Sequence, residues 1–189
     1  MRFECTDLFF FVTLIICESI FLKLLLQLDN NQQFMHLATM LAIKLQLFNH
    51  CSGLVNERIH NIEEAMRNAQ ASANEETKSS AGDKYETGRA MMHLEKEKLS
   101  TQLQEASKMK KALDQINPQK ELNSVQLGCI VVTSTAKYFL SVSLGQIKTG
   151  EESYFAISPA SPIGRALFGK KKSDLFEFAG KRFNILEVS

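Results

Sequence analysis

Apolar side chains recur with a seven-residue period through much of the chain. Counting alternately three and four positions from Phe34 reaches apolar residues as far as Ala73, with Ser52 as the polar exception. A period of 3.5 residues places these positions along one side of an α-helix, so the spacing predicts a long helix that packs against another helix. The series is Phe34, Ala38, Leu41, Leu45, Phe48, Ser52, Val55, Ile59, Ile62, Met66, Ala69 and Ala73.

A second, less regular row follows after a polar segment. Its companion row is interrupted by Glu95 and Gln102, but the main row keeps the step of seven: Tyr85, Met92, Leu99, Ala106 and Leu113. Residues 74–84 separate the two rows, and Gly82 within them is suited to ending a helix or turning the chain. The pattern predicts two helices joined as an antiparallel hairpin.

The lengths of the two arms set the limits of this hairpin. The second arm has 33 residues and stops before Pro118, whose ring disfavours helix in the preceding residue. The same number of residues counted back from Ala73 reaches Leu41. Each arm would be about 50 Å long at 1.5 Å per residue. We therefore expect residues 36–118 to form an antiparallel α-helical coiled-coil hairpin with its tip near residues 74–86.

The period changes again in the last third of the chain. Runs of β-branched and aromatic residues predict five strands in residues 123–189, and the last two runs flank Gly180-Lys181 like a hairpin. The runs are Gln126–Ser134, Tyr138–Leu144, Ser153–Ile157, Asp174–Phe178 and Arg182–Val188. Ahead of the fourth run, Ser161 can cap, Pro162 can open and Gly169 can close a short helix. The expected fold class is α+β.

Residues 1–35 form an apolar extension that has no partner in this hairpin. In residues 8–28, 16 of 21 side chains are hydrophobic, a length that could span a bilayer. Glu18 lies at the centre, however, and a central charge costs about 2.5 to 3.5 kcal/mol against about 0.3 to 0.6 gained per strongly apolar residue. Two interpretations follow: translation begins at Met35 or Met40, or the run anchors a coiled-coil scaffold protein in a membrane.

Composition excludes several classes of protein. The 189 residues are 44% hydrophobic and 23% charged, as in globular proteins. Because 22 basic and 21 acidic residues leave a net charge of +1, no global attraction to nucleic acid or to an anionic membrane is expected. The four cysteines are scattered and lack metal-ligand spacing, which argues against a disulfide framework or a zinc site and favours the reducing cytosol.

Two motifs carry a resemblance to a known family. The chain reads Gly82-Asp83-Lys84-Tyr85-Glu86 at the expected hairpin tip, and residues 161–170 read Ser-Pro-Ile-Gly-Arg-Ala-Leu-Phe-Gly-Lys. A helical hairpin with the first motif, followed by a small β domain with the second, resembles the bacterial Gre family of transcript cleavage factors. The similarity extends from about Met40 to the C-terminus.

The resemblance implies a fold and a set of partners. The C-terminal domain would be FKBP-like without isomerase activity and would dock on RNA polymerase, while the hairpin enters the secondary channel and reaches the 3′ end of the nascent RNA. The protein would be a cytoplasmic monomer without stable membrane association, and it would stimulate the polymerase's own nuclease rather than act as an enzyme. The expected partner-binding residues are Ser161, Pro162, Gly164, Arg165, Gly169 and Lys170.

The resemblance also assigns a role to two tip carboxylates. Asp83 and Glu86 would help the polymerase hold Mg²⁺, a hard ion that prefers carboxylate oxygens and that can activate a water for RNA cleavage. The same pair also fits an N-terminal capping box, and the two roles can coexist.

The tip departs from the family pattern in two respects. Thr87, Gly88 and Arg89 follow Glu86 in place of the family's residues, and Ser79 replaces a basic residue that contacts RNA in the family. Nearby basic residues could supply that charge: Lys78, Lys84 and Arg89. A relative that occupies the channel without stimulating cleavage is therefore the nearest alternative.

Overall fold

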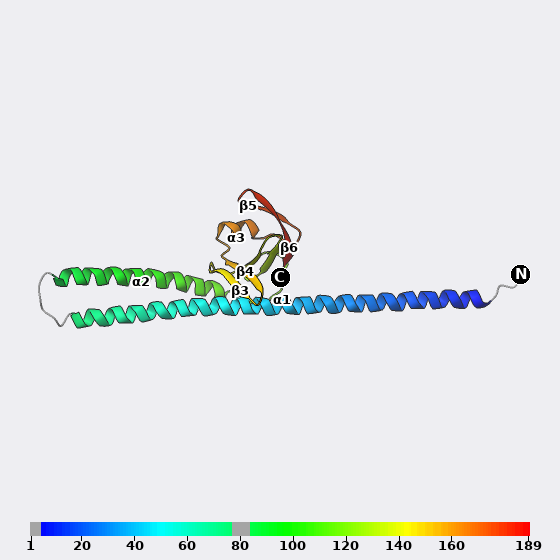
Figure 1. The fold of residues 1–189 in the computed structure, drawn as a ribbon, viewed down its shortest axis with the longest axis horizontal. Helices are drawn as coiled ribbons and strands as arrows, with labels where there is room; N and C mark the ends of the chain where they lie inside the picture. Colours follow the sequence, from blue (N-terminus) through cyan, green and yellow to red (C-terminus); the bar gives the residue numbers. More distant parts are fainter. Residues whose placement is uncertain (1–4, 77–83) are drawn as a thin grey trace. The chain divides into compact units, whose positions relative to one another are not determined.

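The chain forms two long helices followed by a sheet domain, which confirms the α+β class (Figure 1). The computed structural model describes the backbone of residues 5–76 and 84–189 and the side chains of residues 31–72 and 90–189. Helix α1 spans Cys5–Glu76 and helix α2 spans Lys84–Asp114. Residues 1–42 and 43–189 form two separate units. The second unit holds the end of α1, all of α2 and the sheet domain.

The sheet domain contains six strands and one short helix. The strands are arranged in the order β3-β4-β2-β1-β6-β5, and all neighbours are antiparallel except β2 and β4. Helix α3 lies between β4 and β5 in the chain. The bounds are β1 Ile130–Thr133, β2 Lys137–Leu140, β3 Gly145–Thr149, β4 Glu152–Ile157, α3 Pro162–Leu167, β5 Leu175–Phe178 and β6 Lys181–Val188.

The prediction of five strands is wrong by one. Strand β3 was missed because it lies at the edge of the sheet and buries only Ile147 of its five residues, so it lacks an apolar run. The predicted second strand also ends early, at Leu140. Ser141 and Val142 are buried but lie in a bend, where the amide of Leu144 donates to the carbonyl of Val142 at 3.0 Å.

The predicted C-terminal hairpin is confirmed with its turn one residue earlier. Phe178 pairs with Lys181, so the loop consists of Ala179 and Gly180, with φ angles of 52° and 72°. Two consecutive positive φ angles are those of a type I′ turn, whose twist matches that of the flanking strands.

The two faces of the sheet bury different clusters because side chains alternate along each strand. Ile130 and Phe139 join one cluster, while their neighbours Val131 and Leu140 join the other. The first cluster also contains residues of both long helices: Leu47, Cys51 and Val55 of α1, and Leu113 and Ile116 at and just beyond the end of α2. The second cluster contains Leu167 of α3 together with Phe176 and Ile185. The helices therefore cover one face of the sheet and α3 covers the other.

Farther along the helices, α1 and α2 pack on each other without the sheet. Ile62 of α1 is buried with Leu99 and Ala106 of α2, and Ile59 and Met66 pack against this cluster. Positions 55, 59, 62 and 66 of the predicted apolar row are therefore buried or half-buried, as expected. In α2, Leu99, Ala106 and Leu113 of the predicted row are buried.

The predicted row is wrong in the part of α1 that meets the sheet. Leu45 was expected to be inside but is 43% exposed, whereas Leu47 and Cys51 are completely buried. The buried face has shifted because α1 must contact both α2 and the sheet at this level, and the sheet covers positions that a two-helix seam would leave in water.

Lys44 lies in the same shifted face and is only 3% exposed. Its Nζ donates a hydrogen bond of 2.8 Å to the carbonyl oxygen of Lys120, in the segment that joins α2 to the sheet domain. Burial lowers the pKa of Lys44, and the nearby Cys129 and Glu121 partly oppose that effect. Burial also raises the pKa of the Cys129 thiol to about 11.

We expect Leu47→Ala to destabilise the protein far more than Leu45→Ala. Truncating a fully buried leucine leaves a cavity and lowers the free energy of unfolding by about 2 to 5 kcal/mol. The half-exposed Leu45 should cost less than about 1 kcal/mol. Urea unfolding of the full chain, followed by circular dichroism, measures both values. Equal losses would contradict the shifted face.

Cys129 should react very slowly in the native protein. At pH 8 a thiol with a pKa of about 11 has roughly 100-fold less thiolate than one with the ordinary value of 9.0, before steric shielding is considered. Ellman's reagent added to a Cys5→Ser, Cys17→Ser, Cys51→Ser variant, with and without urea, isolates this thiol. Rapid labelling in the absence of urea would contradict its burial.

Candidate functional site

The predicted partner-binding residues surround helix α3, and Ser161 begins that helix as its N-cap. The Ser161 hydroxyl accepts a 3.1 Å hydrogen bond from the amide of Gly164 and donates one of 2.7 Å to the carbonyl of Ser158. Pro162 occupies the first turn, where the missing N–H has no partner to lose. The predicted cap and first residue of this helix are confirmed.

Gly164 is required by a close backbone approach. A Cβ atom at this position would lie 2.1 Å from the carbonyl oxygen of Ser158 and 2.9 Å from the Ser161 hydroxyl. A distance of 2.1 Å to a backbone atom cannot be relieved by a side-chain rotation. Glycine therefore holds the segment before α3 tightly against the helix.

Gly169 and Lys170 fasten the end of the motif to the start of the sheet domain. The amide of Gly169 donates to the carbonyl of Val125 at 2.8 Å, and the amide of Val125 donates to the carbonyl of Lys170 at 2.7 Å. Gly169 has a φ of 77°, a left-handed conformation that favours glycine after a helix. Both residues act here through their backbone, as the predicted helix closure at Gly169 requires.

The motif thus contains residues that shape the backbone, residues such as Leu167 that pack in the core, and residues that face solvent. Ser161, Gly164 and Gly169 serve local geometry, while Pro162 and Arg165 are exposed and Lys170 is half-buried. Phe168 is 54% exposed although it is large and apolar, and it is not among the predicted partner-binding residues. The available signal was a large apolar side chain next to the glycine at which the predicted short helix closes.

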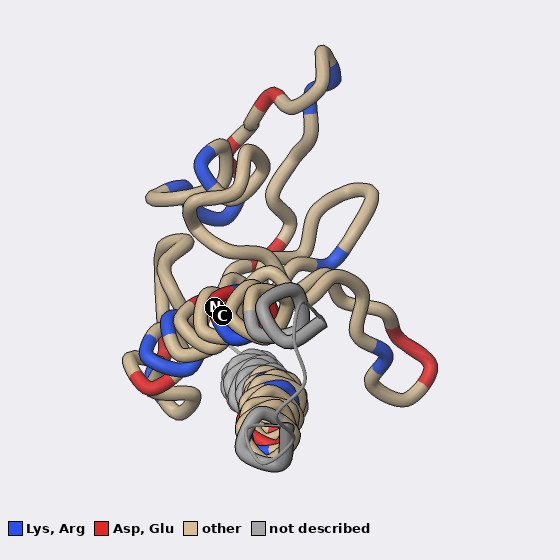
Figure 2. The backbone as a smooth tube through the Cα atoms, turned by 90° about the vertical axis from the view of Figure 1, so that its left-hand side faces the viewer, with Lys and Arg blue, Asp and Glu red and all other residues tan. Residues whose placement is uncertain are grey.

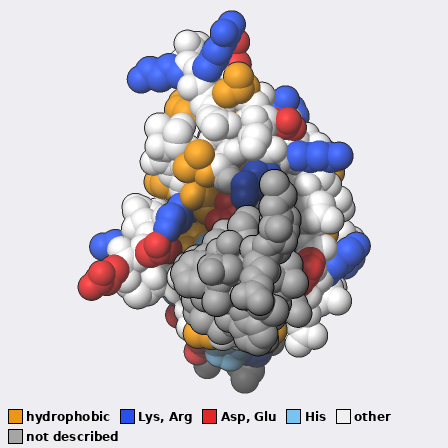
Figure 3. Space-filling view, turned by 90° about the vertical axis from the view of Figure 1, so that its right-hand side faces the viewer, with side chains coloured by type: hydrophobic (Ala, Val, Ile, Leu, Met, Phe, Trp, Pro, Cys, Tyr) orange, Lys and Arg blue, Asp and Glu red, His pale blue; other side chains and the backbone are white. Residues whose placement is uncertain are grey.

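Basic charge is concentrated around this loop. Residues 161–184 contain six basic and two acidic residues, whereas the rest of residues 123–189 contains two basic and three acidic ones. Figure 2 shows basic positions on the loops of the sheet domain, and Figure 3 shows Lys and Arg side chains that project at the top of the view beside hydrophobic ones. The six basic residues are Arg165, Lys170, Lys171, Lys172, Lys181 and Arg182.

The residues predicted at the hairpin tip lie outside the part whose side chains are described. They are the two carboxylates Asp83 and Glu86 and the basic residues Lys78, Lys84 and Arg89. Among the residues that are described, no group of three or more His, Cys, Asp or Glu side chains could hold a metal ion. The predicted magnesium ligands Asp83 and Glu86 lie outside those residues.

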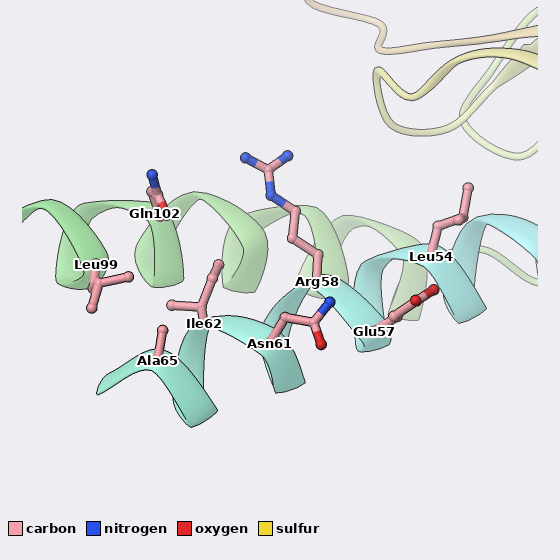
Figure 4. A pocket seen from close by; sticks show the side chains of 8 residues that line it. All are labelled: Leu54, Glu57, Arg58, Asn61, Ile62, Ala65, Leu99 and Gln102. Carbon is pink, nitrogen blue, oxygen red and sulfur yellow. The ribbon is translucent and has the colours of Figure 1, made fainter. Parts of the chain in front are cut away.

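A groove of about 450 Å³ lies between the two long helices (Figure 4). Its apolar lining comes from Ile62 and Ala65 of α1 and Leu99 of α2, which belong to the cluster that holds the helices together. Leu54 of α1 adds to this apolar lining. The polar lining comes from Glu57, Arg58, Asn61 and Gln102. Figure 4 shows Ile62 and Leu99 in the space between the helices, so the groove borders the helix contact and offers no cluster of catalytic groups.

A polar cluster of three side chains, Lys137, Glu152 and Tyr154, joins strands β2 and β4. Lys137 and Tyr154 both donate hydrogen bonds to the carboxylate of Glu152, the latter at 2.5 Å. These bonds lower the pKa of Glu152, while burial and the carboxylate raise the pKa of Tyr154. Lys137 and Tyr154 face each other in the register of this parallel pair. The cluster therefore stabilises strand pairing.

Comparison with known proteins gives no match, either to protein-family models or to curated protein sequences. Within residues 31–72 and 90–189, no helix has an apolar stretch long enough to cross a membrane. The apolar run of residues 8–28 lies outside that part of the chain.

We expect opposite effects from alanine at two glycines. Gly164→Ala should lower the free energy of unfolding by more than about 2 kcal/mol, because the new methyl group meets the Ser158 carbonyl. Gly53→Ala should raise it by about 0.5 to 1 kcal/mol, because Gly53 lies within α1 with no atom near its Cβ position. Urea unfolding compares the two variants. A Gly164→Ala protein as stable as wild type would contradict the close approach.

Proposed function

We propose that the chain is a transcription elongation factor of Gre type, which binds RNA polymerase and stimulates cleavage of backtracked nascent RNA. The observation that carries the proposal is the order of two motifs along the chain. The acidic motif of residues 82–86 overlaps the start of α2 at Lys84, and the motif of residues 161–170 contains the capped helix α3 of the sheet domain.

Within the α+β class, we propose a more specific architecture. Helices α1 and α2 form an antiparallel coiled-coil hairpin, which is supported by the burial of Ile62 with Leu99 and Ala106. The sheet domain is the FKBP-like docking domain, supported by a sheet that packs α3 on one face. Its basic loop, with Arg165 and Lys170, contacts the polymerase.

The tip acts in the active site of the polymerase. Asp83 and Glu86 would hold a magnesium ion jointly with the polymerase, and the ion would supply an activated water for RNA cleavage. Lys78, Lys84 and Arg89 contact the RNA near its 3′ end. The protein is cytoplasmic and monomeric, and it supplies ligands to another enzyme's reaction without catalysing one alone.

A second candidate function rests on the departures at the tip. Thr87, Gly88 and Arg89 differ from the residues usual in the family, and Ser79 stands where a basic residue is usual. In this alternative the hairpin enters the same channel and slows elongation without stimulating cleavage.

The test is transcript cleavage in stalled, backtracked elongation complexes of bacterial RNA polymerase. We expect the wild-type chain to accelerate the release of short 3′ RNA fragments. An Asp83→Asn, Glu86→Gln double variant should lose at least about tenfold of this acceleration, because amides are poorer Mg²⁺ ligands than carboxylates. Asparagine caps a helix as well as aspartate does, so the loss would not report a broken cap.

An Asp83→Asn, Glu86→Gln variant that still binds polymerase makes the comparison specific to the tip. Wild-type protein that slows elongation but leaves the RNA uncut would replace the proposal with the channel-occupying alternative. Absence of binding to polymerase would refute both and would favour the scaffold interpretation.

A further inference from the structure

Strand β5 forms one edge of the sheet and pairs only with β6 within the described chain. Because Phe178 and Lys181 flank a two-residue turn, they exchange hydrogen bonds, and the bonded positions then alternate along the hairpin. The amide of Ile185 donates to the carbonyl of Asp174 at 3.0 Å, which agrees with this alternation. The N–H and C=O groups of Leu175 and Glu177 therefore point away from β6, toward the open edge.

An exposed apolar pair lies beside this edge. Leu175 lies opposite Asn184 of β6, which makes Leu186 its diagonal neighbour on the same face. Leu175 is 63% exposed and Leu186 is 48% exposed. The adjacent residues Phe176 and Ile185 are buried on the other face with α3. A further strand added at β5 would place its own side chains next to Leu175.

The charge around this edge defines what kind of strand fits. Six basic residues lie in or beside α3 and the β5–β6 hairpin, against three acidic ones, Asp174, Glu177 and Glu187. Among the described residues, no ion pair involves any of these six. They are free to meet an acidic partner, and opposite charges on neighbouring strands stabilise pairing.

The other edge of the sheet provides an internal comparison. On β3, the loop Gly150-Glu151 separates the paired residues Thr149 and Glu152, so the backbone groups of Gln146 and Lys148 point outward. Lys148 and Glu151 balance each other along this edge, and the carboxylate of the neighbouring Glu152 is already bonded to Lys137, so the edge lacks the excess of basic residues found around β5. The two edges offer the same hydrogen-bonding pattern with different charge.

We propose that the outer edge of β5 binds an extended acidic peptide segment with apolar residues at alternate positions, as an added strand. Main-chain hydrogen bonds to Leu175 and Glu177 hold such a segment, its apolar side chains cover Leu175, and its acidic side chains meet the surrounding lysines and arginines. This site requires neither the hairpin tip nor polymerase, so it goes beyond the proposed function. Nucleic acid could use the basic residues, but it has no alternating donors and acceptors to match the edge.

Amide hydrogen exchange measured by NMR on the full chain tests the site directly. The probe is a capped eight-residue peptide of alternating aspartate and valine. Its addition should slow exchange of the Leu175 and Glu177 amides at least tenfold and leave those of Gln146 and Lys148 unchanged. Unaltered exchange at saturating peptide, or equal slowing at both edges, would overturn the proposal. Binding of an oligothymidine strand without any binding of the peptide would overturn it as well.

Two substitutions at one position separate the hydrogen bond from charge. Glu177→Pro removes an outward N–H without breaking a ladder bond to β6, as proline on an edge strand allows. It also removes an acidic group, so charge alone would strengthen peptide binding.

We expect the Glu177→Pro protein to bind the peptide about 3- to 10-fold more weakly than the Glu177→Thr protein does, because the loss of one hydrogen bond weakens binding by about this factor. Glu177→Thr, which keeps the N–H, should bind at least as well as wild type. Thermal unfolding of both variants checks that the sheet is intact. Equal peptide affinity in the two folded variants would overturn strand addition.

Discussion

The contact between one face of the sheet and the two long helices is the interaction on which the second unit depends. Phe139 and Tyr154 are completely or almost completely buried against a surface made by Leu47, Val55 and Leu113. Burial of each such side chain contributes about 1.5 to 3 kcal/mol. The same contact selects which side of α1 faces inward, because a helix that meets a sheet and a second helix must bury a wider face than one that meets a helix alone.

A buried lysine in this contact ties the parts together by a polar bond. Lys44 gives up water, and its hydrogen bond to the Lys120 carbonyl compensates both groups at the segment that leads from α2 into the sheet. Burial lowers the pKa of Lys44 and raises the pKa of the nearby Cys129 thiol, so each group is less readily charged than in water. Such a bond is directional, whereas apolar packing is not, so it favours one register of helix on sheet.

The ten-residue motif at α3 combines residues that set the backbone, residues that pack in the core and residues that face solvent. Ser161, Gly164 and Gly169 shape the backbone through a cap, a close approach and a left-handed turn, Leu167 is buried in the core, and Arg165 and Phe168 are exposed. The cap and the glycines therefore place the exposed Arg165 close in sequence to the exposed Phe168. The excess of basic over acidic residues in the sheet domain comes from α3, the residues beside it and the neighbouring hairpin.

Local signals were sufficient for the parts of the structure that are held by local contacts. The periodicity of residues 55–66, the Ser161 cap with Pro162, and the C-terminal hairpin each depend on neighbours within a few positions. All three were predicted, with the turn of the hairpin placed one residue too late. The buried face at Lys44 and Leu47 depends instead on residues more than sixty positions away in the chain, such as Lys120. Strand β3 lies at an edge of the sheet and has only one buried side chain, Ile147. No local pattern encodes either feature. The candidate site divides in the same way. Its motif was visible in the residues, but the open edge of β5 exists only because the sheet ends there, and strand order is a property of the folded chain.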